Sequence, residues 1–179
     1  MTQTDWSAFF RKIDALPKGD RVSLKREAGT MLSQANGRAI CVFYQCLPYS
    51  VPHWQEERAF AAACLHCLWD ADEARRQPME QIFYQLGRNQ NVSESVGHRV
   101  EVLLDLPWDE DGFLLTKLSR MVQLAKSKGY AVDCRKLLED LLYWNGEKQT
   151  IQRKWARALY IKPEETQSES KGEGSTHAV

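Results

Sequence analysis

The stretch LLTKLSRMVQLAKSKG (114–129) has the spacing of an amphipathic α-helix with a defined end. Its leucine, methionine and valine residues recur at intervals of three and four, so at 100° per residue they share one face. Cations in the last turn and a glycine just beyond it match the preferences of a helix C-terminus. On the polar side, Lys117 and Arg120 share one flank, Lys128 lies near Lys117, and Lys126 falls on the other flank.

The same periodicity recurs along nearly the whole chain and predicts a series of helical segments. They cover residues 4–15, 19–34, 36–47, 53–69, 78–86, 93–106, 111–128, 133–145 and 147–161. Proline and glycine residues separate the segments, and the alternating pattern of a half-buried strand does not extend over any useful length. The sequence therefore predicts an all-α fold, a bundle of about seven to nine helices joined by short loops.

The length of 179 residues suffices for one domain with its own core, or for two small units that share an interface. We expect a single helical domain over 1–162. An alternative division has an N-terminal subdomain over 1–106 and a basic C-terminal subdomain over 107–162. The remaining stretch, 163–179, is polar and rich in glycine, serine and glutamate, which predicts a disordered tail.

The sequence gives no sign of a membrane or secreted protein. No window approaches the roughly 18 consecutive apolar residues that a membrane span needs. The N-terminal stretch lacks the basic and apolar regions of a secretory signal. The five cysteines, odd in number and unevenly spaced, fit reduced thiols better than a disulfide framework. We therefore expect a cytoplasmic protein without a membrane partner.

The charge of the chain is zero overall but is distributed unevenly. Residues 1–112 hold 12 lysines and arginines against 16 acidic residues, whereas residues 113–162 hold 11 against 4. Residues 163–179 hold one lysine against four glutamates. Because salt screens exposed charges beyond about 8–10 Å, local charge decides whether a surface attracts phosphate. The helices of 113–162 are therefore the candidate anion-binding part of the protein.

Two further helices contribute cations to this basic block. Arg135 and Lys136 open the segment 133–145, and the last helix carries Arg153, Lys154 and Arg157. If these helices pack as antiparallel neighbours of 111–128, their basic flanks merge into one patch suited to phosphate and to single-stranded nucleic acid. For a lone basic helix, the ordinary interpretation is a solvated face.

Aromatic residues interleave with these cations. They are Tyr143, Trp144, Trp155 and Tyr160. An aromatic ring beside a cation suits base stacking, but large aromatics at helical spacing more often anchor a core. We expect the core role for each of the four.

Three blocks of the chain carry a resemblance to a known family. They read SVGHRVEVLLD, LLTKLSRMVQLAKSKGYAVDCRKLLEDLLYW and IQRKWARALY, in this order within residues 93–161. Upstream, the basic pair in VSLKRE and the later FYQCLP support the same assignment. In order and spacing these blocks resemble the CasB family, the small subunit of Cascade, which is the type I-E CRISPR RNA-guided surveillance complex of antiviral defence.

The resemblance implies an all-helical, two-part bundle with no catalytic activity and no cofactor. It implies head-to-tail association with a second copy, beside the backbone subunits and the large subunit of the complex. It also implies RNA and DNA binding, in which a basic surface steadies the hybrid of CRISPR RNA and target DNA and holds the displaced strand of the R-loop. This chain departs from the family pattern in its acidic loop PWDED (107–111) and in its polar tail.

By position, the resemblance carries nucleic-acid-binding roles to seven residues: Lys25, Arg26, Arg99, Lys117, Arg120, Arg153 and Arg157. Arg21 lies close to the first pair and joins it. The basic helices supply the remaining members of the predicted set: Lys126, Lys128, Arg135, Lys136 and Lys154.

A zinc site is the main chemical alternative. CLHC (64–67), with Cys41, Cys46 or His53, offers the thiolate and imidazole ligands that zinc prefers. However, FAAACLHCLW is an apolar helical segment, in which cysteine behaves as a small hydrophobe. A second CxxC or HxxxH is missing, so we expect Cys64 and Cys67 to lie in the core without a metal.

Two non-enzymatic alternatives remain open. The chain lacks a phosphate-binding loop, a nucleophile elbow and metal-protease motifs, so we do not expect an enzyme. A helical protein adaptor would use the basic face to meet an acidic protein instead of nucleic acid. A helix-turn-helix DNA reader is compatible with the short GYAV connection, but its second helix offers only Arg135 and Lys136 as polar readers.

Overall fold

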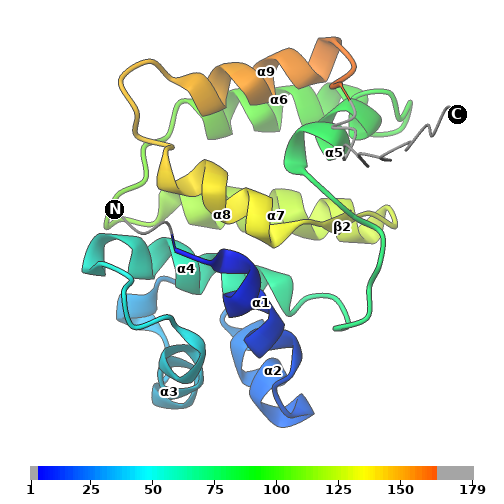
Figure 1. Ribbon diagram of the computed structural model, residues 1–179. Helices are drawn as coiled ribbons and strands as arrows, with labels where there is room; N and C mark the ends of the chain where they lie inside the picture. Colours follow the sequence, from blue (N-terminus) through cyan, green and yellow to red (C-terminus); the bar gives the residue numbers. More distant parts are fainter. Residues whose placement is uncertain (1–3, 165–179) are drawn as a thin grey trace, which may run out of the picture.

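The computed structural model describes residues 4–164 of the chain (Figure 1). Within them lie nine α-helices, one short 3-10 helix (η1) and a pair of two-residue strands. The helices are α1 (Trp6–Asp14), α2 (Lys18–Arg26), η1 (Leu32–Gln34), α3 (Gly37–Cys46), α4 (His53–His66), α5 (Met79–Leu86), α6 (Ser93–Leu104), α7 (Phe113–Ser127), α8 (Cys134–Leu142) and α9 (Thr150–Tyr160). The prediction of an all-α fold is confirmed. Most of the predicted disordered tail, residues 165–179, lies outside the described residues.

Local side-chain chemistry explains where several helices begin and end. Asp133 caps α8 by accepting hydrogen bonds from the backbone N–H groups of Arg135 and Lys136, and aspartate is one of the residue types preferred at this position. Asn36 caps α3 and Asp5 caps α1 in the same way. Beyond the end of α7, Gly129 has a φ of 84°, the left-handed conformation that glycine adopts at no steric cost.

The predicted single helix over 19–34 is wrong in the structure. It is interrupted after α2 and resumes only as the short η1. The cause is Gly29, which has a φ of 92° and lies against α7. A Cβ atom built at Gly29 would come within 2.8 Å of the Ser119 Oγ atom. Because this approach involves α7, the helical periodicity of 19–34 gave no sign of it.

A second difference is the pair of strands β1 (Arg76–Gln77) and β2 (Ala131–Val132). They run parallel, with Arg76 opposite Ala131. Two residues are too few to produce an alternating pattern, so the sequence shows no strand there. The pair ties the segment that follows α4 to the turn between α7 and α8.

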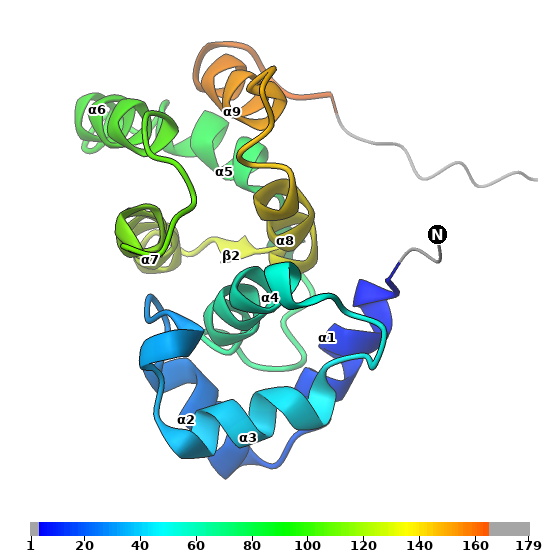
Figure 2. The same ribbon diagram turned by 90° about the vertical axis from the view of Figure 1, so that its left-hand side faces the viewer.

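The helices form two groups that meet around α4, α7 and α8 (Figures 1 and 2). Helices α1, α2 and α3 lie on one side of α4, and α5, α6 and α9 lie on the far side of α7 and α8. Helix α4 packs against α2 below it and against α8 and α7 above it. Figure 2 shows α7 and α8 set apart from each other, with β2 between them.

Two tryptophans anchor the junction between α8 and α9. Trp144 and Trp155 are fully buried, with ring centroids 5.0 Å apart in an edge-to-face arrangement. The Trp144 indole N–H donates to the Leu106 carbonyl, and that of Trp155 donates to the Asp140 carboxylate, each at 2.8 Å. The core role predicted for these two residues is confirmed.

The two tyrosines of the same set behave differently. Tyr143 is 70% exposed and Tyr160 is 72% exposed, so the core role predicted for them is wrong. Each lies at the end of its helix, where no other helix covers the side chain.

Among residues 4–164, no helix is both long and apolar enough to cross a membrane.

Candidate nucleic-acid interface

A groove of about 350 Å³ runs between α6 and α7, and we call it the α6–α7 groove. Its lining residues are His98, Arg99, Val102, Lys117, Arg120 and Met121. Three of them, Arg99, Lys117 and Arg120, belong to the set predicted from the sequence, and all three are exposed. The fold thus brings together a cation from α6 and two from α7.

The amphipathic faces of the two helices explain this convergence. Leu118 and Val122 of α7 and Val100 and Leu103 of α6 are buried in the core. With those faces fixed, the flank next to the apolar stripe on each helix turns toward the other helix. The basic flank of α7 therefore becomes one wall of a groove instead of an isolated solvated face.

The groove is electropositive because its cations lack acidic neighbours. No carboxylate of residues 4–164 lines it, and none of the three cations forms a salt bridge with a described residue. His98, which also lines the groove, has its Nδ1 atom 3.9 Å from the Oε2 atom of Glu101, a long contact between exposed groups. Only the packing of α6 on α7 places His98 in the groove.

The predicted N-terminal basic pair lies on another side of α7. Lys25 and Arg26 are exposed in the last turn of α2. The chain then passes Gly29, whose contact with Ser119 is on the buried side of α7. In Figure 2, α2 lies below α7 while α6, which supplies the other wall of the groove, lies above it. The pair does not line the groove.

The cations at the end of α7 and at the start of α8 do not line the α6–α7 groove. Lys126 and Lys128 are exposed at the C-terminal end of α7. Arg135 and Lys136 are half-buried at the start of α8, and the Arg135 Nη1 atom lies 3.2 Å from the Oε1 atom of Glu139. Both helices pack against α4, but α7 packs in addition against α6 and α8 against α1, and α7 and α8 are not one of the main packed pairs of the bundle. The condition for one merged patch over α7, α8 and α9 is therefore not met.

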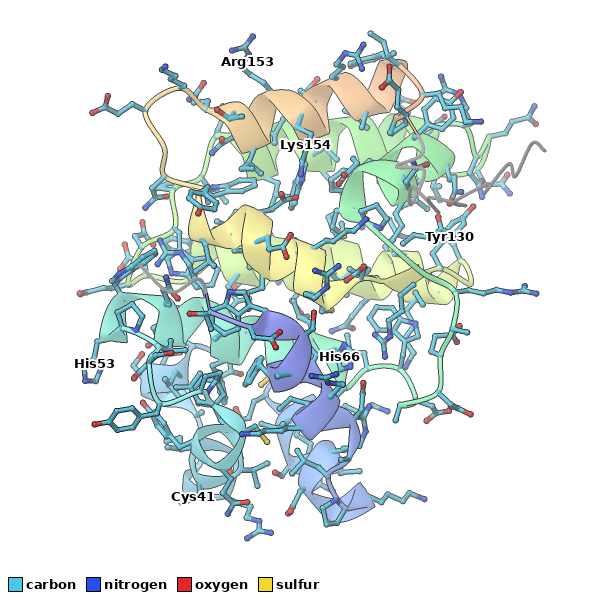
Figure 3. The ribbon with its side chains drawn as sticks, viewed as in Figure 1. Cys41, His53, His66, Tyr130, Arg153 and Lys154 are labelled. Atoms are coloured by element: carbon cyan, nitrogen blue, oxygen red, sulfur yellow. The ribbon has the colours of Figure 1, made fainter. Side chains whose placement is uncertain are left out.

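The cations of α9 take different directions. Arg153 and Arg157 are exposed, and Figure 3 shows Arg153 directed away from the bundle. Lys154 turns toward α8, where its ammonium pairs with Asp140 and lies 3.9 Å from Glu80 (Figure 3). Lys154 is thus held by internal carboxylates, while its two neighbours remain open to solvent.

Arg21 is built into the structure of the N-terminal helices. Its Nη1 atom lies 3.0 Å from the Asp14 carboxylate, and its Nη2 atom donates to the Trp69 carbonyl at 2.9 Å. Only 12% of its side chain is exposed. This guanidinium joins α2 to α1 and to the end of α4, and it has little surface to offer a ligand.

The cysteines of CLHC lie in the core. Cys64 is fully buried and Cys67 nearly so, and burial raises the pKa of the Cys67 thiol to about 11 and that of Cys64 well above its usual value. Zinc binding requires thiolates, which this environment disfavours. His66 directs its Nε2 atom to Asp14 at 2.8 Å. Residues 4–164 contain no group of three or more His, Cys, Asp or Glu placed to hold a metal.

A second hollow carries exposed aromatic residues that the sequence did not single out. It has a volume of about 810 Å³ and lies between the start of α4 and the segment that joins α8 to α9. Trp54, which is 56% exposed, and Tyr143 line it together with Arg58. The Arg58 guanidinium lies 5.2 Å from the Trp108 ring centroid, and its Nε atom donates to the Leu141 carbonyl. These contacts join residues that are far apart in the sequence, so no local sequence pattern predicts them.

Comparisons with known proteins agree on one family. The model of the family "CRISPR-associated protein Cse2" matches residues 20–160. A CRISPR-associated protein Cse2 of Thermus thermophilus is 28% identical over 124 residues, which are 65% of this chain and 68% of the relative. The crystal structure of M. ruber CasB has 24% identity and a TM-score of 0.69, over 89% of this chain and 94% of that one.

A chain of a solved CRISPR RNA-guided surveillance complex has the same fold, with a TM-score of 0.68 at 19% identity. The match covers 86% of this chain and 92% of that one. The family model spans more than three quarters of the sequence, and it is the CasB family that the motifs of 93–161 resemble. The chain therefore belongs to the Cse2 (CasB) family of CRISPR-associated proteins, and with it to a family of structural, non-catalytic subunits.

Proposed function

We propose that this chain is the small subunit of a CRISPR RNA-guided surveillance complex and holds nucleic-acid backbone in the α6–α7 groove. Family membership and the fold shared with a chain of a solved surveillance complex support the first part. One observation carries the second part: Arg99, Lys117 and Arg120 converge from two packed helices on a groove that no described carboxylate lines.

The chemistry of the groove suits backbone binding without sequence reading. In RNA-guided recognition, base pairing reads the sequence while protein contacts backbone and shape. Arginine and lysine on rigid helices provide charge and directed donors for phosphate oxygens. In this proposal the ligands are the hybrid of CRISPR RNA and target DNA and the displaced strand. The protein partners are the backbone subunits, the large subunit and a second copy of this chain.

The proposal is tested by assembling the complex with its own partner subunits, CRISPR RNA and a matching duplex, and measuring the lifetime of the R-loop. The groove variant Arg99→Ala/Lys117→Ala/Arg120→Ala is compared with Arg11→Ala/Lys12→Ala/Lys18→Ala. The control variant removes three exposed cations from α1 and α2 and gives the same change in net charge.

If the groove holds the strands, the groove variant assembles normally but its R-loop dissociates at least about tenfold faster, while the control stays near wild type. Equal lifetimes for the two variants would contradict the assignment of this groove. Failure of the wild-type chain to join the complex would contradict the role as its subunit.

The aromatic hollow supports a second candidate function, a helical adaptor that contacts protein alone. Trp54, Tyr143 and Arg58 are of the residue types that dominate the energetics of protein interfaces. An adaptor of this kind predicts that Trp54→Ala/Tyr143→Ala blocks entry into the complex, and that the groove variant leaves the R-loop lifetime unchanged. The two variants thus separate the candidates.

A further inference from the structure

We propose that the surface formed by the start of α4 and by the loops that follow α6 and α8 is a docking site for a partner protein. The segment that it fits carries an arginine or lysine beside a large apolar side chain. This inference goes beyond the proposed function, because the surface shares no lining residue with the α6–α7 groove. It also gives a role to the acidic loop 107–111, which does not line the groove.

Two hollows adjoin on this surface. The aromatic hollow of about 810 Å³ and another of about 570 Å³, which we call the acidic hollow, are both lined by Trp54 and Arg58. The acidic hollow is also lined by Glu57, Asp109 and Glu110. Figure 1 shows the start of α4 and the end of α8 at the same end of the molecule. One partner segment can therefore contact both hollows, with Trp54 between them.

The aromatic hollow offers apolar surface to a partner. Trp54 is 56% exposed and Tyr143 is 70% exposed. Exposed apolar surface rimmed by polar residues is typical of interaction sites, and tryptophan and tyrosine are enriched among the residues that dominate interface energetics. The charges of Glu147 and Lys148, which also line this hollow, oppose each other. The aromatic hollow therefore suits a large apolar side chain.

The acidic loop is anchored at both ends. The Trp108 backbone N–H donates to the Asn145 Oδ1 atom, and the Asn145 amide donates to the Trp108 carbonyl, each at 2.8 Å. At the other end, Gly112 has a φ of 70°, and a Cβ atom built there would come within 2.9 Å of the Met31 Cγ atom. Because the loop between these anchors is held before a partner binds, its ordering adds little to the entropy cost of association.

The carboxylates of the loop lack a cationic partner. Asp109 and Glu110 are exposed, and neither forms a salt bridge with any of residues 4–164. The Arg58 guanidinium is engaged elsewhere, 5.8 Å from the Trp54 ring centroid and 5.2 Å from that of Trp108, and it donates to two backbone carbonyls. The acidic hollow therefore attracts an arginine or lysine of a protein and repels phosphate, which favours a protein partner over nucleic acid.

The contribution of the loop carboxylates is measured with the surveillance complex of the proposed function, assembled from its other subunits and CRISPR RNA without this chain. Asp109→Asn/Glu110→Gln is compared with Asp70→Asn/Asp72→Asn, which removes two exposed carboxylates from another loop. Asparagine at position 109 keeps the oxygen that accepts from the Asp111 N–H, so the loop retains its turn.

We expect Asp109→Asn/Glu110→Gln to bind the rest of the complex about fivefold more weakly than wild type at 100 mM salt, because two exposed ion pairs are lost. The control variant should bind like wild type, and the difference should shrink at 500 mM salt, which screens such pairs. Equal affinities of the two variants at 100 mM salt would overturn the inference.

A second measurement uses the isolated chain and so does not depend on the proposed function. A tetrapeptide of alternating leucine and arginine, blocked at both ends, is added to the ¹⁵N-labelled protein, and the tryptophan indole signals are followed by NMR. The signal missing in Trp54→Phe identifies Trp54. A tetrapeptide with glutamate in place of arginine is the matched control.

We expect the arginine peptide to shift the Trp54 signal saturably, with an affinity about fivefold lower in Asp109→Asn/Glu110→Gln, and the glutamate peptide to leave the signal in place. The absence of a shift, or equal shifts with the two peptides, would refute the docking site even if the groove binds nucleic acid. A saturable shift of the same signal by a 20-nucleotide DNA would assign the surface to nucleic acid and overturn the inference.

Discussion

At the residue scale, the least expected feature is the buried group formed by Asp14, Arg21 and His66. The His66 Nε2 atom lies 2.8 Å from the Asp14 carboxylate, and its Nδ1 atom has no hydrogen-bond partner among the described residues. Burial lowers the pKa of His66 below its usual 6.5, although the bond to Asp14 opposes this. Burial raises the pKa of Asp14, but the hydrogen bonds and charges of His66 and Arg21 outweigh it and hold that pKa below 3.8.

The His66 group predicts a loss of stability on acidification. Around and below pH 6.5, His66 binds a proton more readily in the unfolded chain than in the folded chain. The free energy of unfolding therefore decreases as the pH is lowered. The slope is at most about 1.4 kcal/mol per pH unit from this residue. Below pH 3.8, protonation of Asp14 removes further stability in the same direction.

Urea unfolding at pH 7.5 and pH 5.5 measures this effect, and His66→Asn should be less sensitive to pH than wild type. His53→Asn is the control, because its imidazole is almost fully exposed. An unchanged pH dependence in His66→Asn would show that another group is responsible.

The candidate site was predictable from the sequence only in part. Lys117 and Arg120 share a flank because both belong to one helix, and helix geometry alone fixes that relation. The resemblance to the CasB family brought in Arg99, but no local pattern could show that α6 packs on α7 with Arg99 facing the two cations. Burial of Arg21 depends on Asp14 and on the carbonyl of Trp69, which is 48 residues away.

At the element scale, Gly29 controls how the N-terminal helices meet α7. The residue has positive φ, and any side chain there would meet Ser119. Helix periodicity predicted one continuous helix over 19–34 because it reports only which face is apolar. Most other helix positions were predictable within a few residues, since the caps and stops are set by nearby side chains such as Asp133.

Gly29→Ala should therefore destabilise the protein by about 1–3 kcal/mol, from the strained backbone and the contact with Ser119 together. Gly19→Ala is the matched control. Gly19 lies in α2 with nothing within 4 Å of a Cβ, so alanine there should be neutral or mildly stabilising. Thermal and urea unfolding measure the stability of both variants. If Gly29→Ala were as stable as Gly19→Ala, the turn at Gly29 would have no special role.

At the scale of the whole molecule, we propose that residues 1–162 form a single domain. The alternative boundary at 106 gains little support from the packing, because α5 and α6 precede it but pack against α9 and α7, which follow it. The separation of α7 from α8 also divides the basic residues among several faces. Net charge along the chain identified the basic block 113–162, but the fold decided which of its cations share a groove.

The salt dependence of single-stranded DNA binding tests the central claim most directly, because it counts the phosphates that the protein neutralises. If about four phosphates are engaged, the logarithm of the affinity falls with the logarithm of salt concentration at a slope near −3. Arg99→Ala/Lys117→Ala/Arg120→Ala should reduce the magnitude of that slope by about 2, and Arg11→Ala/Lys12→Ala/Lys18→Ala should leave it nearly unchanged. A wild-type slope retained by the groove variant would contradict the claim that the α6–α7 groove holds the nucleic-acid backbone.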